Sequence, residues 1–191
     1  MKKAILILSL FLVCAFFAQL CYSQIDLVLG LTKSSITGGE SWKDPIGVQL
    51  GAIIPVFNIN ESMSVRVEAN ISMQGARWEE SVYSGRLNLL YINVPVVLRY
   101  QTESGLFAEA GIQPGILLSA KDKWEDITED YKDYMNIFDM SIPVEVGYQI
   151  NDKVGVGIRV IPGITDITED EHEADRNLVF AFRGTWRFNY K

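Results

Sequence analysis

The chain has 191 residues, and its 17 lysines and arginines against 24 aspartates and glutamates give a formal net charge of −7 at pH 7. This acidic balance disfavours contact with a phosphate backbone, so we expect no nucleic-acid partner. The two cysteines, Cys14 and Cys21, both lie near the N-terminus, so residues 22–191 contain no thiol for a disulfide, a thiolate metal site or a cysteine nucleophile.

The beginning of the chain has the pattern of a secretory signal peptide. Two lysines precede an apolar run at residues 4–18, and a short segment that ends at Ser23 follows this run. We predict cleavage after Ser23, which gives a signal peptide at 1–23 and one mature domain at 24–191. Because the two lysines are removed, the formal charge of the mature chain becomes −9.

Two other interpretations of this segment fit less well. An uncleaved membrane anchor needs a helix of about 20 apolar residues, and the run at 4–18 is shorter. Acylation of Cys21, as in a lipoprotein, calls for a small residue before the cysteine, where this chain has Leu20.

The mature chain consists of eight runs in which apolar residues alternate with polar or small ones. A period of two residues is typical of strands. Most of these runs are longer than the usual soluble strand of about 5–6 residues, and they match the roughly 9–11 residues with which a tilted strand crosses a bilayer. No later segment is apolar over the length of a spanning helix, so membrane insertion would use strands. The runs lie at residues 25–32, 46–57, 63–72, 88–100, 106–120, 137–150, 154–165 and 177–190.

The connections between these runs alternate between long and short. This asymmetry is typical of an up-and-down outer membrane barrel, in which short turns face the periplasm and long loops face outward. We therefore predict an all-β fold, an eight-stranded antiparallel transmembrane barrel with both termini on the periplasmic side. The long connections lie at 33–45, 74–86, 121–136 and 166–176, and the short ones at 58–62, 102–105 and 151–153.

The direction of the apolar face distinguishes a membrane barrel from its alternative, a secreted soluble lipocalin-like barrel. A soluble barrel of this kind lines its cavity with the apolar row. In this chain the other row carries glycines and equal numbers of cations and anions, which suits a closed interior where buried ions must be paired. Aromatic residues near the strand ends of the apolar row match the girdles at a lipid interface. We therefore predict a lumen charge row that consists of Arg66, Arg99, Arg159, Arg183 and Arg187 with Asp26, Glu68, Glu109, Asp139 and Glu145.

One ion pair follows from the register of the last short hairpin. If residues 151–153 form a three-residue connection, Gln149 pairs with Gly155. Counting back in steps of two then places Glu145 opposite Arg159 on the inward face. Directly opposed residues have Cβ atoms about 4.5–5.5 Å apart, so the carboxylate and the guanidinium are expected to bond.

Several short segments also match a known family. They are residues 91–95 (Tyr-Ile-Asn-Val-Pro), 109–111 (Glu-Ala-Gly), 115–121 (Gly-Ile-Leu-Leu-Ser-Ala-Lys), 163–167 (Gly-Ile-Thr-Asp-Ile) and 176–177 (Arg-Asn). With these segments the chain resembles the PorT-like outer membrane β-barrel family of Bacteroidetes, most strongly from residue 87 onward. The chain departs from the family at Asn93, where a glutamate is common, and at Ile112, where a proline is common. The resemblance implies a small outer membrane barrel and a role as an accessory to secretion.

Residues for chemistry are few, and we expect no catalytic, cofactor or metal site. The single histidine, His172, lies among carboxylates in an acidic segment, whereas a lipid-modifying barrel enzyme would need it on a strand rim beside a serine. The acidic loops lack the Asp-x-Asp-x-Asp-Gly spacing of a calcium loop. Gly155 and Gly157 lie in a strand with no helix after them, so they are expected to relieve crowding in a narrow interior rather than to bind phosphate.

These observations predict an integral outer membrane barrel with a packed polar lumen. Eight strands leave an interior just wide enough for side chains to fill, which disfavours a wide pore. The expected partners are outer membrane lipid and a protein that binds the acidic outer loops. The expected role is structural or interactive, and an outer membrane lipid-modifying enzyme is the alternative.

Overall fold

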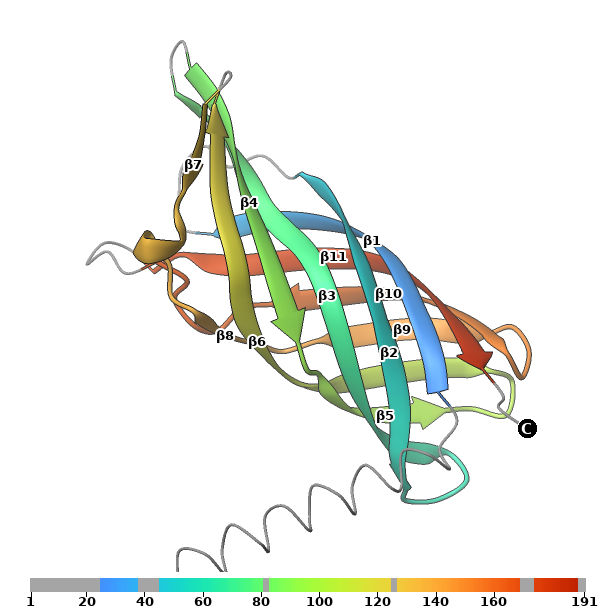
Figure 1. Ribbon diagram of the computed structural model, residues 1–191. Coiled ribbons are helices and arrows are strands. Elements are labelled where there is room, and N and C mark those ends of the chain that lie inside the picture. Colours follow the sequence, from blue (N-terminus) through green and yellow to red (C-terminus); the bar gives the residue numbers. More distant parts are fainter. Residues whose placement is uncertain (1–24, 38–44, 81–82, 125–126, 169–173, 189–191) are drawn as a thin grey trace, which may run out of the picture.

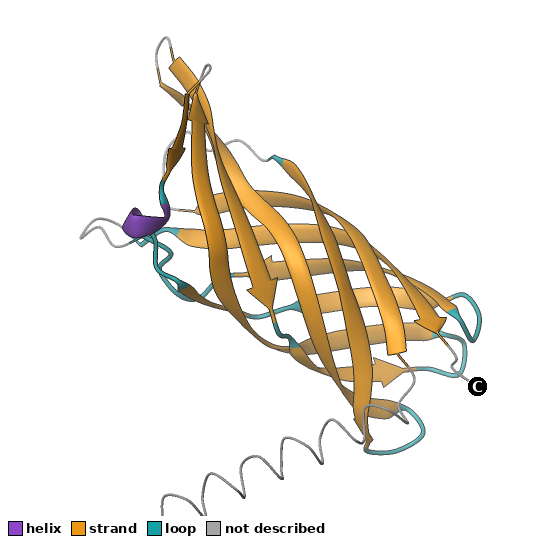
Figure 2. Cartoon of the chain, in the orientation of Figure 1, coloured by secondary structure: helices purple, strands orange, loops and turns teal. Residues whose placement is uncertain are grey.

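The computed structural model describes residues 25–37, 45–80, 83–124, 127–168 and 174–188, and the predicted signal peptide lies outside these ranges. Within them the chain is almost entirely strand, with one short helical turn (Figure 2). No helix in these ranges is long and apolar enough to span a membrane. The elements are β1 (Ile25–Thr37), β2 (Ile46–Asn58), β3 (Met63–Glu80), β4 (Tyr83–Asn93), β5 (Val96–Gln101), β6 (Leu106–Trp124), β7 (Ile127–Asp130), η1 (Lys132–Tyr134), β8 (Phe138–Ser141), β9 (Val144–Gln149), β10 (Val154–Pro162) and β11 (Arg176–Phe188).

The strands close into one antiparallel barrel of eight staves, which confirms the predicted fold class (Figure 1). β1 pairs with β2 on one side and with β11 on the other, so the first and last strands close the ring. β4 and β5 form one stave, interrupted at Val94 and Pro95, and β8 and β9 form another, interrupted at Ile142 and Pro143. The sheet remains bonded across the first interruption, where the N–H of Glu68 donates to the carbonyl of Pro95 at 2.9 Å.

The connections divide the barrel into two different ends. The short-turn end carries residues 59–62, 102–105 and 150–153, together with the start of β1 and the finish of β11. Asparagine side chains shape two of its turns, because Asn60 Oδ1 accepts from the N–H of Met63 at 2.8 Å and Asn151 Oδ1 accepts in the same way from Val154. The opposite end, which carries the remaining connections, is called the long-connection end. The predicted up-and-down topology is therefore confirmed.

The outer surface of the barrel is apolar, as the predicted outward row requires. Leu29, Val146 and Phe182 are examples from three different staves, with exposed fractions of 66%, 61% and 57%. The charged side chains of Asp26, Glu145 and Arg183 in the same strands are buried inside. The soluble lipocalin-like alternative is therefore wrong, because such a barrel would place the apolar row in its cavity and the charges outside.

At the long-connection end the strands continue beyond their predicted boundaries. The predicted connection at 74–86 is mostly strand, because β3 continues to residue 80 and β4 begins at residue 83. The predicted connection at 121–136 begins with strand, because β6 continues to residue 124 and β7 pairs with it. Figure 1 shows these four strands rising above the rest of the barrel. The apolar alternation fades here because charged side chains such as Arg77 and Lys121 occupy exposed positions. A pattern based on lipid contact does not detect strands outside the lipid.

A β-bulge in β6 reverses the direction of its side chains near the long-connection end. Leu90 pairs with Ser119 but Tyr91 pairs with Leu117, which leaves one extra residue between the two pairs. The alternation of the run at 106–120 puts Ala120 on the outward apolar row, in step with Ile112. That prediction is wrong, because the bulge turns Ala120 into the interior, where it is fully buried.

Candidate functional site

Arg159 is the central residue of the lumen and is fully buried. The register of β10 places it opposite Glu145 of β9, as predicted, and its Nε donates to Oε2 of Glu145 at 2.6 Å. Its Nη1 and Nη2 donate to the two carboxylate oxygens of Glu68 at 2.9 and 2.7 Å, and Nη2 also donates to Glu109 at 2.9 Å. These charge-assisted bonds join β10 to β3, β6 and β9 through one side chain.

Arg183 of β11 is a second buried cation beside Arg159. It donates to Oε2 of Glu68 at 2.8 Å and also bonds to Glu145. The space around Glu145 is crowded, which explains the glycine at position 157 on the neighbouring strand β10. A Cβ at Gly157 would collide with Oε1 of Glu145. The glycine relieves crowding in a narrow interior, as its position in the sequence predicted.

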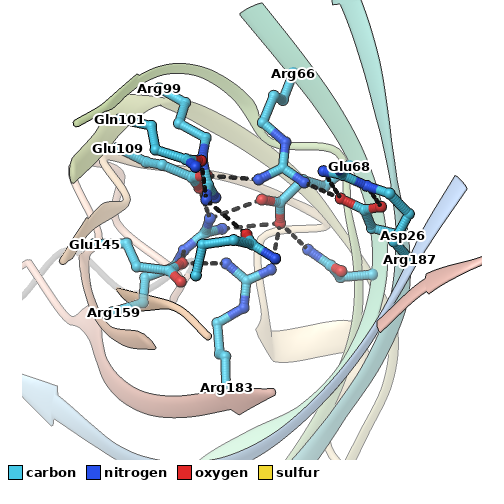
Figure 3. A network of polar contacts seen from close by, with 12 residues as sticks. Asp26, Arg66, Glu68, Arg99, Gln101, Glu109, Glu145, Arg159, Arg183 and Arg187 are labelled. Carbon is cyan, nitrogen blue, oxygen red and sulfur yellow. Dashed lines mark hydrogen bonds and ion pairs between the residues drawn. The ribbon is translucent and has the colours of Figure 1, made fainter. Parts of the chain in front are cut away.

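Further ion pairs extend from Arg159 and Arg183 toward the short-turn end. Arg66 donates to Asp26 at 2.6 Å and to Glu109 at 2.8 Å, and Arg99 donates to the same Glu109 oxygen at 2.9 Å. Arg187 bonds Asp26 from β11 at 3.0 Å. Figure 3 shows that these side chains converge from separate strands into one group. We call this group the ion-pair network; it consists of Arg66, Arg99, Arg159, Arg183 and Arg187 with Asp26, Glu68, Glu109 and Glu145.

Asp139 is buried in the lumen but does not belong to this network. It accepts hydrogen bonds from Thr165 Oγ1 at 2.7 Å and from Asn177 Nδ2 at 3.1 Å. Its predicted inward direction is correct, whereas its predicted place among the arginines is wrong. It precedes Glu145 by six residues on the same stave, a separation of roughly 20 Å along a strand. The alternation of residues predicts which face a side chain points to, but it does not predict which side chains meet at the same height in the lumen.

An apolar cluster that the sequence did not predict fills the lumen at the long-connection end. We call it the apolar plug; it consists of Ile36, Ala76, Leu87, Leu89, Tyr91, Leu117, Ala120, Met135 and Ile167. The prediction of a packed polar lumen is therefore correct for only part of the interior. A signal was present in the sequence, because Leu87, Leu89 and Tyr91 occupy inward positions of their run despite being apolar.

Two connections contribute residues to the apolar plug and are held together by Asn136. The side-chain Nδ2 of Asn136 donates to the carbonyls of Asp166 and Thr168 at 3.1 and 2.7 Å, and its backbone N–H donates to the carbonyl of Ile167 at 2.9 Å. The neighbouring side chains of Met135 and Ile167 are almost completely buried in the barrel mouth. The long-connection end is thus closed by packed side chains.

The short-turn end, in contrast, opens into a cavity of about 840 Å³. Its lining includes Arg66, Arg99 and Arg187 from the ion-pair network, and the rim includes the exposed carboxylates of Glu61 and Glu103. The guanidinium of Arg99 stacks on the Phe107 ring at 3.6 Å, donates to Gln101 at 2.8 and 3.1 Å, and reaches Gln149 at 3.0 Å. The ion-pair network therefore forms the floor of this cavity, which opens at the short-turn end.

The remaining candidates for chemistry do not form a site in the part of the chain that the structure describes. No group of three His, Cys, Asp or Glu side chains is arranged to hold a metal ion within those residues. His172, which the enzyme hypothesis requires, lies outside them. The described geometry is therefore that of a stabilised lumen with an open cavity at the short-turn end.

A closed barrel with an apolar exterior and ion-paired charges inside defines an integral outer membrane β-barrel protein. Residues 17–169 match the family described as outer membrane protein beta-barrel domain. This match covers most of the chain, so the chain belongs to that family, and its location is the cell outer membrane.

Two solved structures are similar in fold. Neisserial surface protein A (NspA) superposes with a TM-score of 0.62 at 10% sequence identity, over 86% of this chain and 97% of that one. The attachment invasion locus protein Ail of Yersinia pestis, in a complex with the heparin analogue sucrose octasulfate, gives a TM-score of 0.52 at 14% identity, over 87% of this chain and 99% of that one. A comparison with curated proteins finds no match.

Proposed function

We propose that this barrel is a structural or interaction protein of the outer membrane, without catalytic activity, and that it acts as an accessory to secretion. The occupied lumen is the observation that carries the proposal. The apolar plug closes one end and the ion-pair network crosses the middle, so a solute has no open path through the barrel. The chain therefore presents surfaces to lipid and to partners rather than a channel.

The link to secretion rests on the resemblance to the PorT-like family of Bacteroidetes. One of the matching segments, residues 91–95, lies where a stave is interrupted, and its Tyr91 belongs to the apolar plug. We place the short-turn end in the periplasm and the long-connection end outside the cell, in keeping with the usual asymmetry of such barrels.

The proposed protein partner binds at the long-connection end. Glu129 and Asp130 are exposed in β7, one of the strands that rise above the rest of the barrel (Figure 1), and Asp133 is exposed in η1, which follows β7. Their charge suits a partner with a basic surface. Outer membrane lipid is the proposed partner of the apolar exterior.

Cross-linking in intact membranes followed by capture of the tagged barrel tests this function. The charge-reversing variant Glu129→Lys/Asp130→Lys is expected to lose a specific cross-linked partner. The matched variant Glu61→Lys/Glu103→Lys reverses two carboxylates at the opposite end and should retain that partner. Equal recovery from both variants would contradict the proposed surface, and a partner outside any secretion system would contradict the proposed pathway.

A conductance measurement in planar bilayers tests the closed lumen independently. The wild-type barrel is expected to show no stable ion current. Enlarging the interior by Met135→Gly/Ile167→Gly, which removes two side chains of the apolar plug, should raise the current if the plug is a barrier. A large steady current through the unmodified barrel would contradict a non-channel function.

A further inference from the structure

The cavity at the short-turn end is lined by arginines that retain hydrogen-bonding capacity. A guanidinium has five N–H donors. Among the described residues, Arg66 uses Nη1 and Nη2 for Glu109 and Asp26, and Arg187 uses Nε and Nη2 for Asp26. Both side chains line the cavity, and that of Arg187 is 32% exposed. Donors therefore remain for a molecule that enters from the short-turn end.

The charges of the ion-pair network do not balance. Its five guanidinium groups share four carboxylates, because Asp139 lies in a separate polar group. The imbalance is greatest next to the cavity, where Arg66 and Arg99 share one oxygen of Glu109 and that carboxylate also accepts from Arg159. An unbalanced charge in a poorly solvated interior is unfavourable unless a counter-charge reaches it.

The size of the cavity and the charges of its rim restrict what can supply that counter-charge. About 840 Å³ lies within the usual range of small-molecule sites, roughly 300–1,000 Å³. Glu61 and Glu103 stand at the rim, so a molecule with many negative charges would meet repulsion at the entrance. A compact ligand with one anionic group can pass the rim and place that group against the arginines.

We propose that this cavity is a binding site for a phosphate-type anion, held at its floor by Arg66, Arg99 and Arg187. Planar guanidinium groups match the oxygens of a phosphate in two-point contacts. Asp26 and Glu109 hold the arginines in place before binding, which limits the loss of side-chain entropy. The anion would supply the charge that the ion-pair network lacks.

Isothermal titration of the detergent-solubilised, folded barrel with inorganic phosphate tests this site. Saturable binding tighter than about 1 mM is expected. Arg187→Gln should weaken it about tenfold, the loss typical of one hydrogen bond to a charged group. Arg77→Gln removes an exposed arginine at the opposite end and should leave it unchanged. Glu61→Gln/Glu103→Gln should strengthen binding, because the rim then repels the anion less.

A second titration identifies the source of the anionic group. Short-chain phosphatidic acid below its micelle concentration replaces inorganic phosphate under the same conditions. Binding of inorganic phosphate assigns a soluble ligand, and binding of the lipid alone assigns a lipid headgroup. Absence of saturable binding for both probes overturns the proposal. Equal effects of Arg187→Gln and Arg77→Gln also overturn it, because binding would then follow the total charge of the barrel.

Discussion

At the scale of single residues, neighbouring positions in one strand have opposite environments. Ile112 is 56% exposed on the lipid-facing surface, whereas Gln113 is 3% exposed and donates to Ser141 Oγ at 3.1 Å. The side chain of residue 112 therefore contacts lipid and that of residue 113 contacts other side chains of the lumen. The alternation of apolar and polar residues along the run at 106–120 predicts this difference.

A pair of arginine substitutions measures that difference. Ile112→Arg should lower the free energy of unfolding by about 2–4 kcal/mol, because it places a charge against lipid. Gln113→Arg directs the same side chain into the lumen, where available space and carboxylate partners determine the cost. Urea unfolding in lipid vesicles gives both values. A larger loss from Gln113→Arg that persists in a variant with extra lumen space would contradict the assigned faces.

The pair of Glu145 and Arg159 allows a double-mutant cycle. Glu145→Gln should cost about 3–5 kcal/mol, because it removes the charge of a buried carboxylate to which both Arg159 and Arg183 donate. Arg159→Met should cost at least as much, and the double variant should cost less than the sum of both. Arg159→Met combined with Glu103→Gln, a change at an exposed turn, provides an additive control. Additive losses for the buried pair would show that the two side chains are not coupled.

At the scale of elements, the connection after β10 depends on one carboxylate. Asp166 Oδ1 accepts from the N–H and the hydroxyl of Thr168 at 3.1 and 3.0 Å and from the N–H of Asp175 at 3.1 Å. Partial burial acts to raise the pKa of Asp166, but these hydrogen bonds and the nearby charge of Arg176 outweigh it, so the pKa is lowered. The ionised form therefore holds the connection in its folded shape.

Acidification should loosen this connection. Because the pKa of Asp166 is lower in the folded state, its stabilising effect is complete above the unfolded value of about 3.9 and is lost as the pH falls through the folded value. NMR shifts of the Thr168 and Asp175 amides should move together with pH and lose this movement in Asp166→Asn. The Lys153 amide bonds to the carboxamide of Asn151 and is the matched control. Equal movement of all three amides would rule out this role for Asp166.

Sequence reasoning succeeded where one physical constraint acts over a whole strand. Contact with lipid imposes the alternation that predicted the staves, the inward charges and the opposition of Glu145 and Arg159. It failed where that constraint ends. The strands near Arg77 and Lys121 rise above the rest of the barrel, the bulge in β6 turns Ala120 inward, and the apolar plug is completed by Met135 and Ile167 from connections between strands. These features depend on three-dimensional contacts that no local period encodes.

At the scale of the whole molecule, the two ends of the barrel have different structures. The long-connection end is closed by the apolar plug, and the short-turn end opens into the cavity. Protease added to intact cells should therefore cut first at residues 166–175 or 131–136, at the end that we place outside. First cleavage at 102–105 would invert this topology, and mass spectrometry of the released fragments distinguishes the two results.

The bonds of Asp26 also have a consequence for the rate of folding. Asp26 joins β1 to Arg187 of β11, a residue 161 positions away, across the seam where the ring closes. Bringing such distant segments together is entropically slow, so the seam is expected to form last. Asp26→Asn should then accelerate unfolding more than it slows refolding, because the contact is absent from the folding transition state. On SDS gels of unboiled samples the folded barrel migrates as a compact band, separate from the unfolded chain. The time course of this band measures both rates, and Asp152→Asn in a turn is the control. If refolding slows as much as unfolding accelerates, the seam closes before the transition state. If unfolding alone accelerates, the bonds of Asp26 keep an assembled barrel from reopening.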